Sequence, residues 1–344
     1  MHVGADTEIT TAEYHTGGEP YRIVTSGVPT PEGETVLDRR AWSEQHLDDV
    51  RALLVNEPRG HADMYGCFVT PPDPDDGRDG RGAFGMVFFH KDGFSTACGH
   101  GTIAGATWAI ESGRIDAVEP VTEVWIDVPS GRLHALADID GGRVTGVRFE
   151  NVPSYVTATD IAVDVDGVRY LVDVSYGGAF YASVDAAQLG ISIAPEHLPT
   201  LIDVGRRIKW EIDAHPATHH PVDPRLGGCY GTIWYERLGD EGSTLHQRNV
   251  TIFADGEVDR SPCGSGTSAR LAVLDHRGEL ARGHTLVHES VVGSQFRARV
   301  LGDGPTIASH PTVRTEVGGR AHRTGTNTVT YDPDDALGLG FQLR

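Results

Sequence analysis

The sequence has few cysteines, no long apolar run and no excess of positive charge. Its 344 residues include four cysteines, Cys67, Cys98, Cys229 and Cys263, and no two of them form a Cys-x-x-Cys pair. Four thiols in a chain of this length do not make a disulfide scaffold, and the missing pair motif argues against a redox enzyme or a zinc site. We therefore expect free thiols in a reducing compartment.

The charge balance and the hydropathy exclude further classes of protein. The 49 acidic residues outnumber the 29 basic ones, and the formal net charge is -20. An acidic surface disfavours nucleic acid and anionic membranes as partners. No run approaches the roughly 18 apolar residues of a membrane helix, and the N-terminal residues lack the basic and apolar regions of a signal peptide. We expect a cytoplasmic protein that binds neither nucleic acid nor membrane.

One cysteine motif occurs twice in near-identical form. Residues 97–104 read ACGHGTIA and residues 262–269 read PCGSGTSA, so both fit x-Cys-Gly-x-Gly-Thr-x-Ala. Cys98 and Cys263 lie 165 positions apart, and each precedes a helix-like segment that ends at a glycine fifteen residues after the cysteine. The repeat indicates two similar halves that each present one thiol. Two thiols on opposite faces of one carbon could remove and return its proton and so invert a stereocentre.

Short alternating apolar runs separated by turn residues dominate the chain and predict strands. Examples of the predicted strands are 21–25, 121–128, 143–149, 168–174, 250–253, 285–292 and 296–301. Helices are predicted at 38–55, with Asp38 or Ser43 as its cap, and after the cysteines at 102–112 and 265–276. Both segments after the cysteines are apolar on most faces, which is typical of a buried helix. The expected fold class is α+β, with a mostly antiparallel sheet around one central helix in each of two pseudo-symmetric halves.

The repeat also predicts the domain organisation. The first half is expected to comprise residues 1–152 plus about 318–344, and the second to comprise residues 153–317. Cys98 belongs to the first half and Cys263 to the second. Residues 150–156 follow a predicted strand, contain a proline and are the expected crossover between the halves.

Two segments are expected to be irregular. Residues 71–82 are rich in Pro, Asp and Gly, which predicts an exposed connection. Residues 215–224 hold three histidines, but their spacing within a Pro-rich loop does not put them on one helix face. We therefore expect no metal site there.

The glycine-rich turn before each central helix suits chemistry on a carboxylate. The first turn of a helix presents unpaired backbone N–H groups, and the helix dipole adds partial positive charge, so an anion binds there. A cysteine at such a start has its thiolate stabilised. The same N–H groups would stabilise charge that develops toward an enediolate. Neither turn reads G-x-G-x-x-G or ends in Gly-Lys, so a nucleotide site has little support.

At these residues the chain resembles the proline racemase family, which includes 4-hydroxyproline 2-epimerases and trans-3-hydroxy-L-proline dehydratases. Four segments carry the resemblance, at residues 15–24, 57–66, 173–182 and 259–269. The resemblance implies a two-domain fold like that of diaminopimelate epimerase, a small imino-acid substrate, and neither cofactor nor metal. A homodimer is compatible with this interpretation, although no particular residue indicates one.

The resemblance also implies roles for individual residues. Cys98 and Cys263 would be the two bases. The substrate carboxylate would be bound by the backbone N–H groups of four residues, Gly99, His100, Gly264 and Ser265. His100 and Asp259 would lie near the ring nitrogen, where a carboxylate pairs well with a secondary ammonium.

The sequence leaves the choice of reaction open. As the resemblance implies, dehydratases usually replace the first cysteine with Ser or Thr, because the 3-hydroxyl leaves after Cα deprotonation and no proton returns. Cys98 therefore favours racemisation or epimerisation. Against that, the segments 60–65, 93–96 and 177–180 look closer to the dehydratase branch. Since the catalytic position is tied directly to the mechanism, we predict two-base inversion at Cα of proline or a hydroxyproline, with dehydration of trans-3-hydroxy-L-proline as the alternative.

The sequence argues against two other classes of function. A non-catalytic imino-acid-binding protein would not need the intact thiols, Asp259 and both glycine turns. A thiol–disulfide redox protein would form a reversible Cys98–Cys263 disulfide, which we expect only as oxidative damage. Both classes are therefore disfavoured.

The remaining cysteines and one aromatic segment are expected to be structural. Cys67 and Cys229 lie in apolar strand contexts and should be buried small hydrophobes. Tyr176, Phe180 and Tyr181 could border a substrate pocket or pack within the sheet, and packing is expected for at least two of them.

Overall fold

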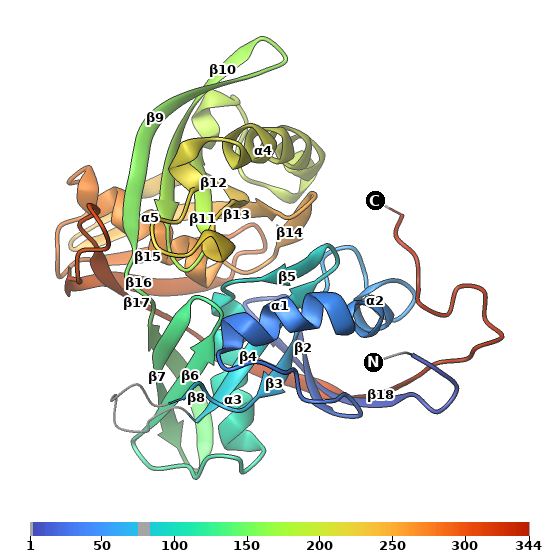
Figure 1. The fold of residues 1–344 in the computed structure, drawn as a ribbon. Helices are drawn as coiled ribbons and strands as arrows, with labels where there is room; N and C mark the ends of the chain where they lie inside the picture. The colour runs from blue at the N-terminus through green and yellow to red at the C-terminus, as the bar shows by residue number, and fades with distance from the viewer. Residues whose placement is uncertain (1–2, 75–82, 344) are drawn as a thin grey trace. The chain divides into compact units, whose positions relative to one another are not determined.

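The computed structural model describes residues 3–74 and 83–343, and the chain folds into two compact units (Figure 1). Unit 1 comprises Met1–Thr16, Pro20–Val147 and Arg320–Arg344, and unit 2 comprises Gly17–Glu19 and Arg148–Gly319. Both units consist of mostly antiparallel strands with few helices, so the predicted α+β class is confirmed. Within the described ranges, no helix is long and apolar enough to cross a membrane.

Unit 1 takes its strands from the N-terminal part of the chain and from one C-terminal segment. They are β1 (Glu8–Thr16), β2 (Glu19–Ser26), β3 (Tyr65–Thr70), β4 (Phe84–His90), β5 (Gly93–Ser95), β6 (Val121–Val128), β7 (Gly131–Asp140) and β18 (Ala321–Thr330), while β8 (Arg143–Glu150) runs across the sequence boundary. β18 is antiparallel to β1 along its whole length. β2 is parallel to β3, and β3 is antiparallel to β4. β4 then pairs with β5 in antiparallel and β6 in parallel orientation, and β7 is antiparallel to β6.

Unit 2 repeats this succession of pairings. Its strands are β9 (Tyr155–Val165), β10 (Val168–Tyr176), β11 (Phe180–Asp185), β12 (Cys229–Glu241), β13 (Thr244–Phe253), β14 (Glu257–Asp259), β15 (Thr285–Ser290), β16 (Gln295–Asp303) and β17 (Val313–Gly319). β9, β10 and β11 are successively antiparallel, and β11 is parallel to β12. β12 is antiparallel to β13, which pairs with β14 in antiparallel and β15 in parallel orientation. β15, β16 and β17 complete the unit with antiparallel pairs.

One buried helix follows the cysteine motif in each unit. The helices are α1 (Val36–His46), α2 (Asp48–Val55), α3 (Gly99–Glu111), α4 (Leu198–Asp213) and α5 (Gly264–His276), with 3₁₀ turns η1 (Ala186–Gln188), η2 (Pro195–His197), η3 (Pro216–Thr218) and η4 (Pro224–Leu226). α3 contacts β1, β6, β7 and β18, and α5 contacts β9, β10, β11, β16 and β17 (Figure 1). Every α3 residue from Gly99 to Ile110 is buried, as its apolar composition predicts.

The first predicted helix is wrong in its continuity and its cap. Residues 38–55 belong to two helices, because Leu47 leaves helical geometry with φ -125° and ψ 13° and is fully buried. The cap of α1 is Thr35, whose Oγ1 accepts a hydrogen bond from the N–H of Asp38. The Asp38 carboxylate in turn accepts a hydrogen bond from the N–H of Thr35, so Asp38 is the third helical residue of a capping box.

The other sequence-based elements agree with the structure to within a few residues. Each predicted strand lies in an observed one, except that β15 ends at Ser290 and leaves the last two residues of 285–292 in a turn. Helix α4 was not predicted, although its buried face repeats every three or four residues at Leu201, Val204, Ile208 and Ile212. Residues 75–82 of the predicted connection lie outside the described residues, and 71–74 have no regular structure.

Candidate functional site

The first cysteine motif caps helix α3. Cys98 is the N-cap residue with extended geometry, φ -155° and ψ 101°, and its Sγ accepts a hydrogen bond from the N–H of Gly101 at 3.3 Å. The N–H and Oγ1 of Thr102 both donate to the carbonyl of Cys98, at 2.9 and 2.8 Å. Because the thiol is held at the positive end of the helix dipole, the local field favours its thiolate.

His100 lies beside this thiol and is buried. Its Nε2 and Nδ1 are 3.4 and 3.6 Å from Sγ of Cys98. The rings of Tyr21 and Tyr65 meet the imidazole edge-on at centroid distances of 5.6 and 5.0 Å, and Oγ1 of Thr16 donates to the His100 carbonyl at 3.0 Å. Burial lowers the pKa of His100 to about 3. The imidazole is therefore neutral at neutral pH and can share a hydrogen bond with the thiol.

Close packing explains the second glycine of this motif. A Cβ added at Gly101 would lie 2.5 Å from Cε2 of Tyr21 and 2.7 Å from Sγ of Cys98. Any side chain there would displace the ring or the thiol. Gly99 and His100 form the first turn of α3, which is where helix N–H groups bind anions.

The second motif starts helix α5 with a different backbone. Cys263 has φ 61° and ψ 96°, a region that residues with a Cβ rarely adopt, and its side chain makes no capping hydrogen bond. The Cys263 N–H donates to Oγ of Ser261 at 3.1 Å, and the Ser261 N–H donates to Oδ1 of Asp259 at 2.8 Å. Such a backbone costs about 1–3 kcal/mol and persists only where its surroundings hold it.

A buried network holds the residue just before this cysteine. The carbonyl of Pro262 accepts hydrogen bonds from Oγ1 of Thr267 at 3.0 Å and from Nδ2 of Asn249 at 2.8 Å. Nδ1 of His288 lies 2.8 Å from each of these donor atoms. Burial, and then the charge of Arg270, lower the pKa of His288 to about 3, so its ring is neutral. The sequence does not predict this network, because its only local sign is a histidine within an apolar strand.

Asp259 ends strand β14 and is 4% exposed. Burial raises its pKa to about 6, although hydrogen bonds from Ser261 act in the opposite direction. Burial, followed by the charge of Asp259, raises the pKa of Cys263 to about 12. A cation bound at Asp259 would cancel part of the negative charge that opposes ionisation of the thiol. An ammonium group on the substrate would thus favour both the aspartate and the thiolate.

Tyr181 reaches the same turn from strand β11. Its hydroxyl lies 2.6 Å from Oγ of Ser265, and Sγ of Cys263 donates to it at 3.7 Å. Tyr176 and Phe180 pack against each other with ring centroids 4.9 Å apart, in agreement with the expected packing role for two residues of this segment. The hydroxyl of Tyr181, in contrast, contacts the thiol of Cys263.

The predicted site residues form two groups, one in each unit. The group in unit 1 consists of Cys98, Gly99 and His100. The group in unit 2 consists of Asp259, Cys263, Gly264 and Ser265. Cys67 and Cys229 are buried in strands, as predicted, and burial raises the pKa of each thiol to about 12.

Two of the three histidines of the Pro-rich segment accept hydrogen bonds in local turns. Nδ1 of His215 accepts a hydrogen bond from the N–H of Ala217 at 3.1 Å, and Nδ1 of His220 accepts one from Asp223 at 3.1 Å. In residues 3–74 and 83–343, no three His, Cys, Asp or Glu side chains are grouped as metal ligands.

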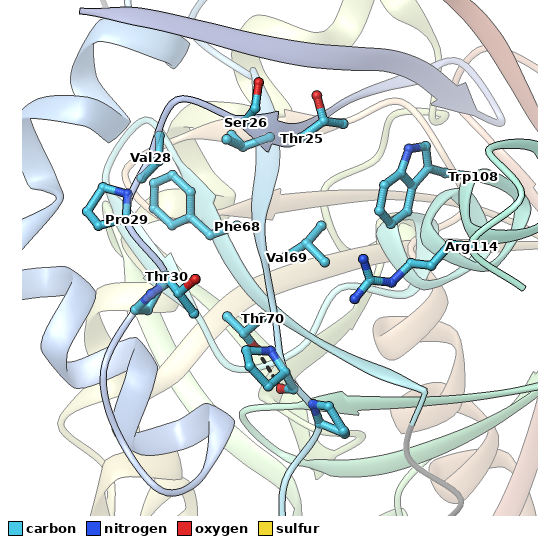
Figure 2. A pocket seen from close by; sticks show the side chains of 14 residues that line it. Thr25, Ser26, Val28, Pro29, Thr30, Phe68, Val69, Thr70, Trp108 and Arg114 are labelled. Atoms are coloured by element: carbon cyan, nitrogen blue, oxygen red, sulfur yellow. Dashed lines mark hydrogen bonds between the residues drawn. The ribbon is translucent and has the colours of Figure 1, made fainter.

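A pocket of about 480 Å³ lies elsewhere in unit 1 (Figure 2). It lies beyond the point where the parallel pairing of β2 and β3 ends, at Val24 and Phe68. Figure 2 shows the guanidinium of Arg114 near the indole of Trp108, with its Cζ 5.9 Å from the ring centroid. The residues described as lining it include no thiol, carboxylate or imidazole. This pocket therefore lacks the groups for proton transfer at carbon.

Comparisons with known proteins cover nearly the whole chain. A family model described as proline racemase matches residues 11–342. A 3-hydroxyproline 2-epimerase of Burkholderia multivorans is 44% identical over 337 residues, which cover 98% of this chain and 98% of that protein. A trans-3-hydroxy-L-proline dehydratase of Bacillus cereus is 42% identical over 334 residues, which cover 97% of this chain and 98% of that protein. The solved structure of a hydroxyproline epimerase from Agrobacterium vitis with bound trans-4-hydroxy-L-proline has a TM-score of 0.89 and 31% identity, and the match covers 98% of this chain and 96% of that one.

Proposed function

The chain belongs to the proline racemase family, and we propose that it inverts Cα of proline or a hydroxyproline by proton transfer between two cysteines. One observation carries the proposal: each unit places a buried cysteine at the glycine-rich start of its central helix. A single thiol would suffice for proton removal alone. Two equivalent positions are what removal from one face and return to the other require.

The proposed roles follow from the chemistry of each turn. One cysteine, as thiolate, takes the Cα proton, so the C–H bond breaks, an S–H bond forms and the electron pair moves toward the carboxylate. The other thiol gives its proton to the opposite face of Cα. The N–H groups of the first helical turns bind the carboxylate and stabilise the enediolate. Asp259 holds the ring ammonium, and His100 shares a hydrogen bond with Cys98. No metal or organic cofactor is needed for these steps.

Dehydration of trans-3-hydroxy-L-proline is the second candidate. Unit 2 by itself contains a thiol, the carboxylate of Asp259 and a helix start, which together form a complete set for one-base chemistry. A relative 42% identical to this chain bears the name of such a dehydratase. In that reaction Cys263 removes the Cα proton, the 3-hydroxyl leaves with its bonding electrons, and no proton returns to Cα.

Proton NMR in D2O tests the proposal with L-proline, trans-4-hydroxy-L-proline and trans-3-hydroxy-L-proline in separate samples. Inversion predicts loss of the Cα proton signal and, for a hydroxyproline, new signals from a second diastereomer. D-proline has the same spectrum as L-proline, so chiral chromatography detects it in the proline sample. Dehydration predicts a dehydrated product from the 3-hydroxy compound alone. If the compounds bind but none of the three exchanges its Cα proton, both candidates are contradicted.

Single cysteine variants separate the two reactions. Inversion predicts that Cys98→Ser and Cys263→Ser both abolish formation of the second stereoisomer. Dehydration through unit 2 predicts that Cys263→Ser alone abolishes product. Cys229→Ala is the matched control, because this buried thiol lies in a strand and takes no part in either scheme. Inversion that persists in Cys98→Ser would exclude the two-base mechanism.

A further inference from the structure

Tyr181 is positioned by a close approach between strand β11 and helix α5. The hairpin that precedes it contains Gly177, where an added Cβ would lie 2.4 Å from the carbonyl oxygen of Ser265 and 2.7 Å from the backbone nitrogen of Ala269. Nδ2 of Asn151 donates to the Gly177 carbonyl at 2.8 Å. Because the hairpin is pressed against the first turn of α5, the side chain of β11 that follows it reaches the cysteine motif.

The Tyr181 hydroxyl joins two members of that motif. It lies 2.6 Å from Oγ of Ser265 and accepts a hydrogen bond from Sγ of Cys263 at 3.7 Å. Its ring is fully buried and meets the ring of Tyr230 edge-on at 5.7 Å. The hydroxyl is therefore held in place, while its own hydrogen can point toward either neighbour.

The two cysteines differ in what stabilises their sulfur atoms. Sγ of Cys98 accepts a hydrogen bond from the N–H of Gly101 and lies 3.4 Å from Nε2 of His100. Cys263 makes no capping hydrogen bond, and the residue that corresponds to the histidine is Ser265. The serine hydroxyl contacts Tyr181, which together with Thr251 is a polar side-chain partner of the second thiol.

We propose that Tyr181 is a catalytic residue that stabilises the thiolate of Cys263 through a reversible hydrogen-bond chain with Ser265. With Cys263 as thiolate, Ser265 donates to the tyrosine oxygen and the tyrosine donates to Sγ. With Cys263 as thiol, Sγ donates to the tyrosine oxygen and the tyrosine donates to Oγ of Ser265. Only hydroxyl hydrogens rotate in this exchange, and the proton on sulfur comes from or returns to Cα. The inference rests on the proposed function, because it treats Cys263 as the base.

Site-resolved alkylation with iodoacetamide tests the link without any substrate. Loss of a hydrogen bond to a thiolate leaves about ten- to a hundredfold less thiolate at a given pH. The greater nucleophilicity of the more basic thiolate offsets about half of that on a logarithmic scale. Tyr181→Phe should therefore slow alkylation of Cys263 by about three- to tenfold between pH 7 and 9. Cys98 in the same sample should keep its rate.

Two further variants make the result specific. Tyr155→Phe is the control, because this buried tyrosine of unit 2 has a hydroxyl without a hydrogen-bond partner among the described residues. Ser265→Ala should slow alkylation of Cys263 by less than Tyr181→Phe does, since it removes only the far end of the chain. An unchanged Cys263 rate in Tyr181→Phe, or an equal change at Cys98, would overturn the proposal.

The Cα exchange rate in D2O separates this inference from the proposed function. If the wild-type protein exchanges Cα of an imino acid, Tyr181→Phe should lower kcat by about ten- to a hundredfold with little change in KM. An unchanged kcat would overturn the catalytic role. If the wild-type protein exchanges none of the three substrates, the proposed function fails, and the alkylation result still decides whether Tyr181 stabilises the thiolate.

Discussion

The backbone N–H of Cys263 donates a hydrogen bond to Oγ of Ser261 at 3.1 Å, while the φ of the same cysteine is 61°. The serine thus helps to fix a conformation that a residue with a Cβ resists. The equivalent residue of the other motif, Cys98, has φ -155° and no such strain. Of the two proposed bases, only Cys263 is held against the preference of its own backbone.

Substitution of this cysteine should show the strain directly. Without a Cβ, a residue adopts positive φ freely, so Cys263→Gly should be more stable than Cys263→Ala by about 1–2 kcal/mol. Cys98→Gly and Cys98→Ala are the control pair. Their free energies of unfolding should differ by less, because the φ of Cys98 is one that a residue with a Cβ readily adopts. Urea unfolding of the four variants measures both differences. Equal differences at the two positions would show that the backbone of Cys263 is not strained.

The network below the second motif should matter more than its counterpart in the first. Thr267→Val removes two buried hydrogen bonds and leaves Nδ1 of His288 without this partner, so we expect a loss of about 1–3 kcal/mol and a lower kcat. Thr102→Val removes only the hydrogen bond from Oγ1 to the carbonyl of Cys98. That carbonyl still accepts a hydrogen bond from the N–H of Thr102. The loss for Thr102→Val should be under about 1 kcal/mol. Hydrogen exchange of amides in the two turns distinguishes the effects, and a larger loss for Thr102→Val would contradict the prediction.

Three buried histidines should make the protein sensitive to acid. Burial lowers the pKa of His90, His100 and His288 to about 3, below the value of about 6.5 in an unfolded chain. The unfolded chain therefore binds more protons between these values, and the free energy of unfolding falls as the pH drops below about 6.5. Each histidine adds a slope of about 1.4 kcal/mol per pH unit. Asp259, with its pKa raised to about 6, acts in the opposite direction between about pH 4 and 6 and offsets one of them.

Urea unfolding between pH 4.5 and 8 measures this slope. His288→Gln keeps hydrogen-bonding groups in the network but removes one titrating ring. Its slope below about pH 6 should be smaller by about 1.4 kcal/mol per pH unit. A wild-type slope retained by the variant would show that His288 does not resist protonation in the folded protein.

The close approach at Gly177 should tolerate no side chain. In Gly177→Ala, the new Cβ would push on the first turn of α5, so we expect a loss of about 1–3 kcal/mol together with reduced kcat. Gly325→Ala is the matched control, because an added Cβ there meets no atom within 4 Å. Thermal unfolding and the Cα exchange assay measure the two effects. Similar losses in both variants would indicate that glycine itself, not the contact with α5, is responsible.

Sequence patterns located seven of the 18 strands in the described residues and both central helices, because alternation and continuous apolar character are local properties. They did not predict the break at Leu47, since the apolar positions of 38–55 continue through it. Within the site, the motif supplied each cysteine and its glycines. The partners Asn249 and His288 were missed, and the contact of Tyr181 with the thiol was not predicted, because strands bring these residues to the motif from positions that no spacing rule connects to it.

The backbone difference between the motifs was also beyond the sequence. ACGHGT and PCGSGT are nearly the same string, yet one cysteine is extended and the other has positive φ. The contacts of the two motifs also differ. Oγ1 of Thr267 donates to the carbonyl of Pro262, which also accepts a bond from Asn249 outside the motif, whereas Oγ1 of Thr102 donates to the carbonyl of Cys98. A local pattern therefore located the thiols without revealing their different surroundings.

The pairing of β1 with β18 has a consequence for the order of events during synthesis. Residues Glu8–Thr16 emerge from the ribosome before unit 2, but their antiparallel partner, Ala321–Thr330, emerges only after unit 2 has been made. Until then β1 presents an unpaired edge, the kind of surface on which nascent chains associate wrongly. Unit 2, apart from three residues, is continuous in the sequence and can form first. Cys263 would thus reach its folded surroundings before β18 has been made, while unit 1, which carries Cys98, is still incomplete.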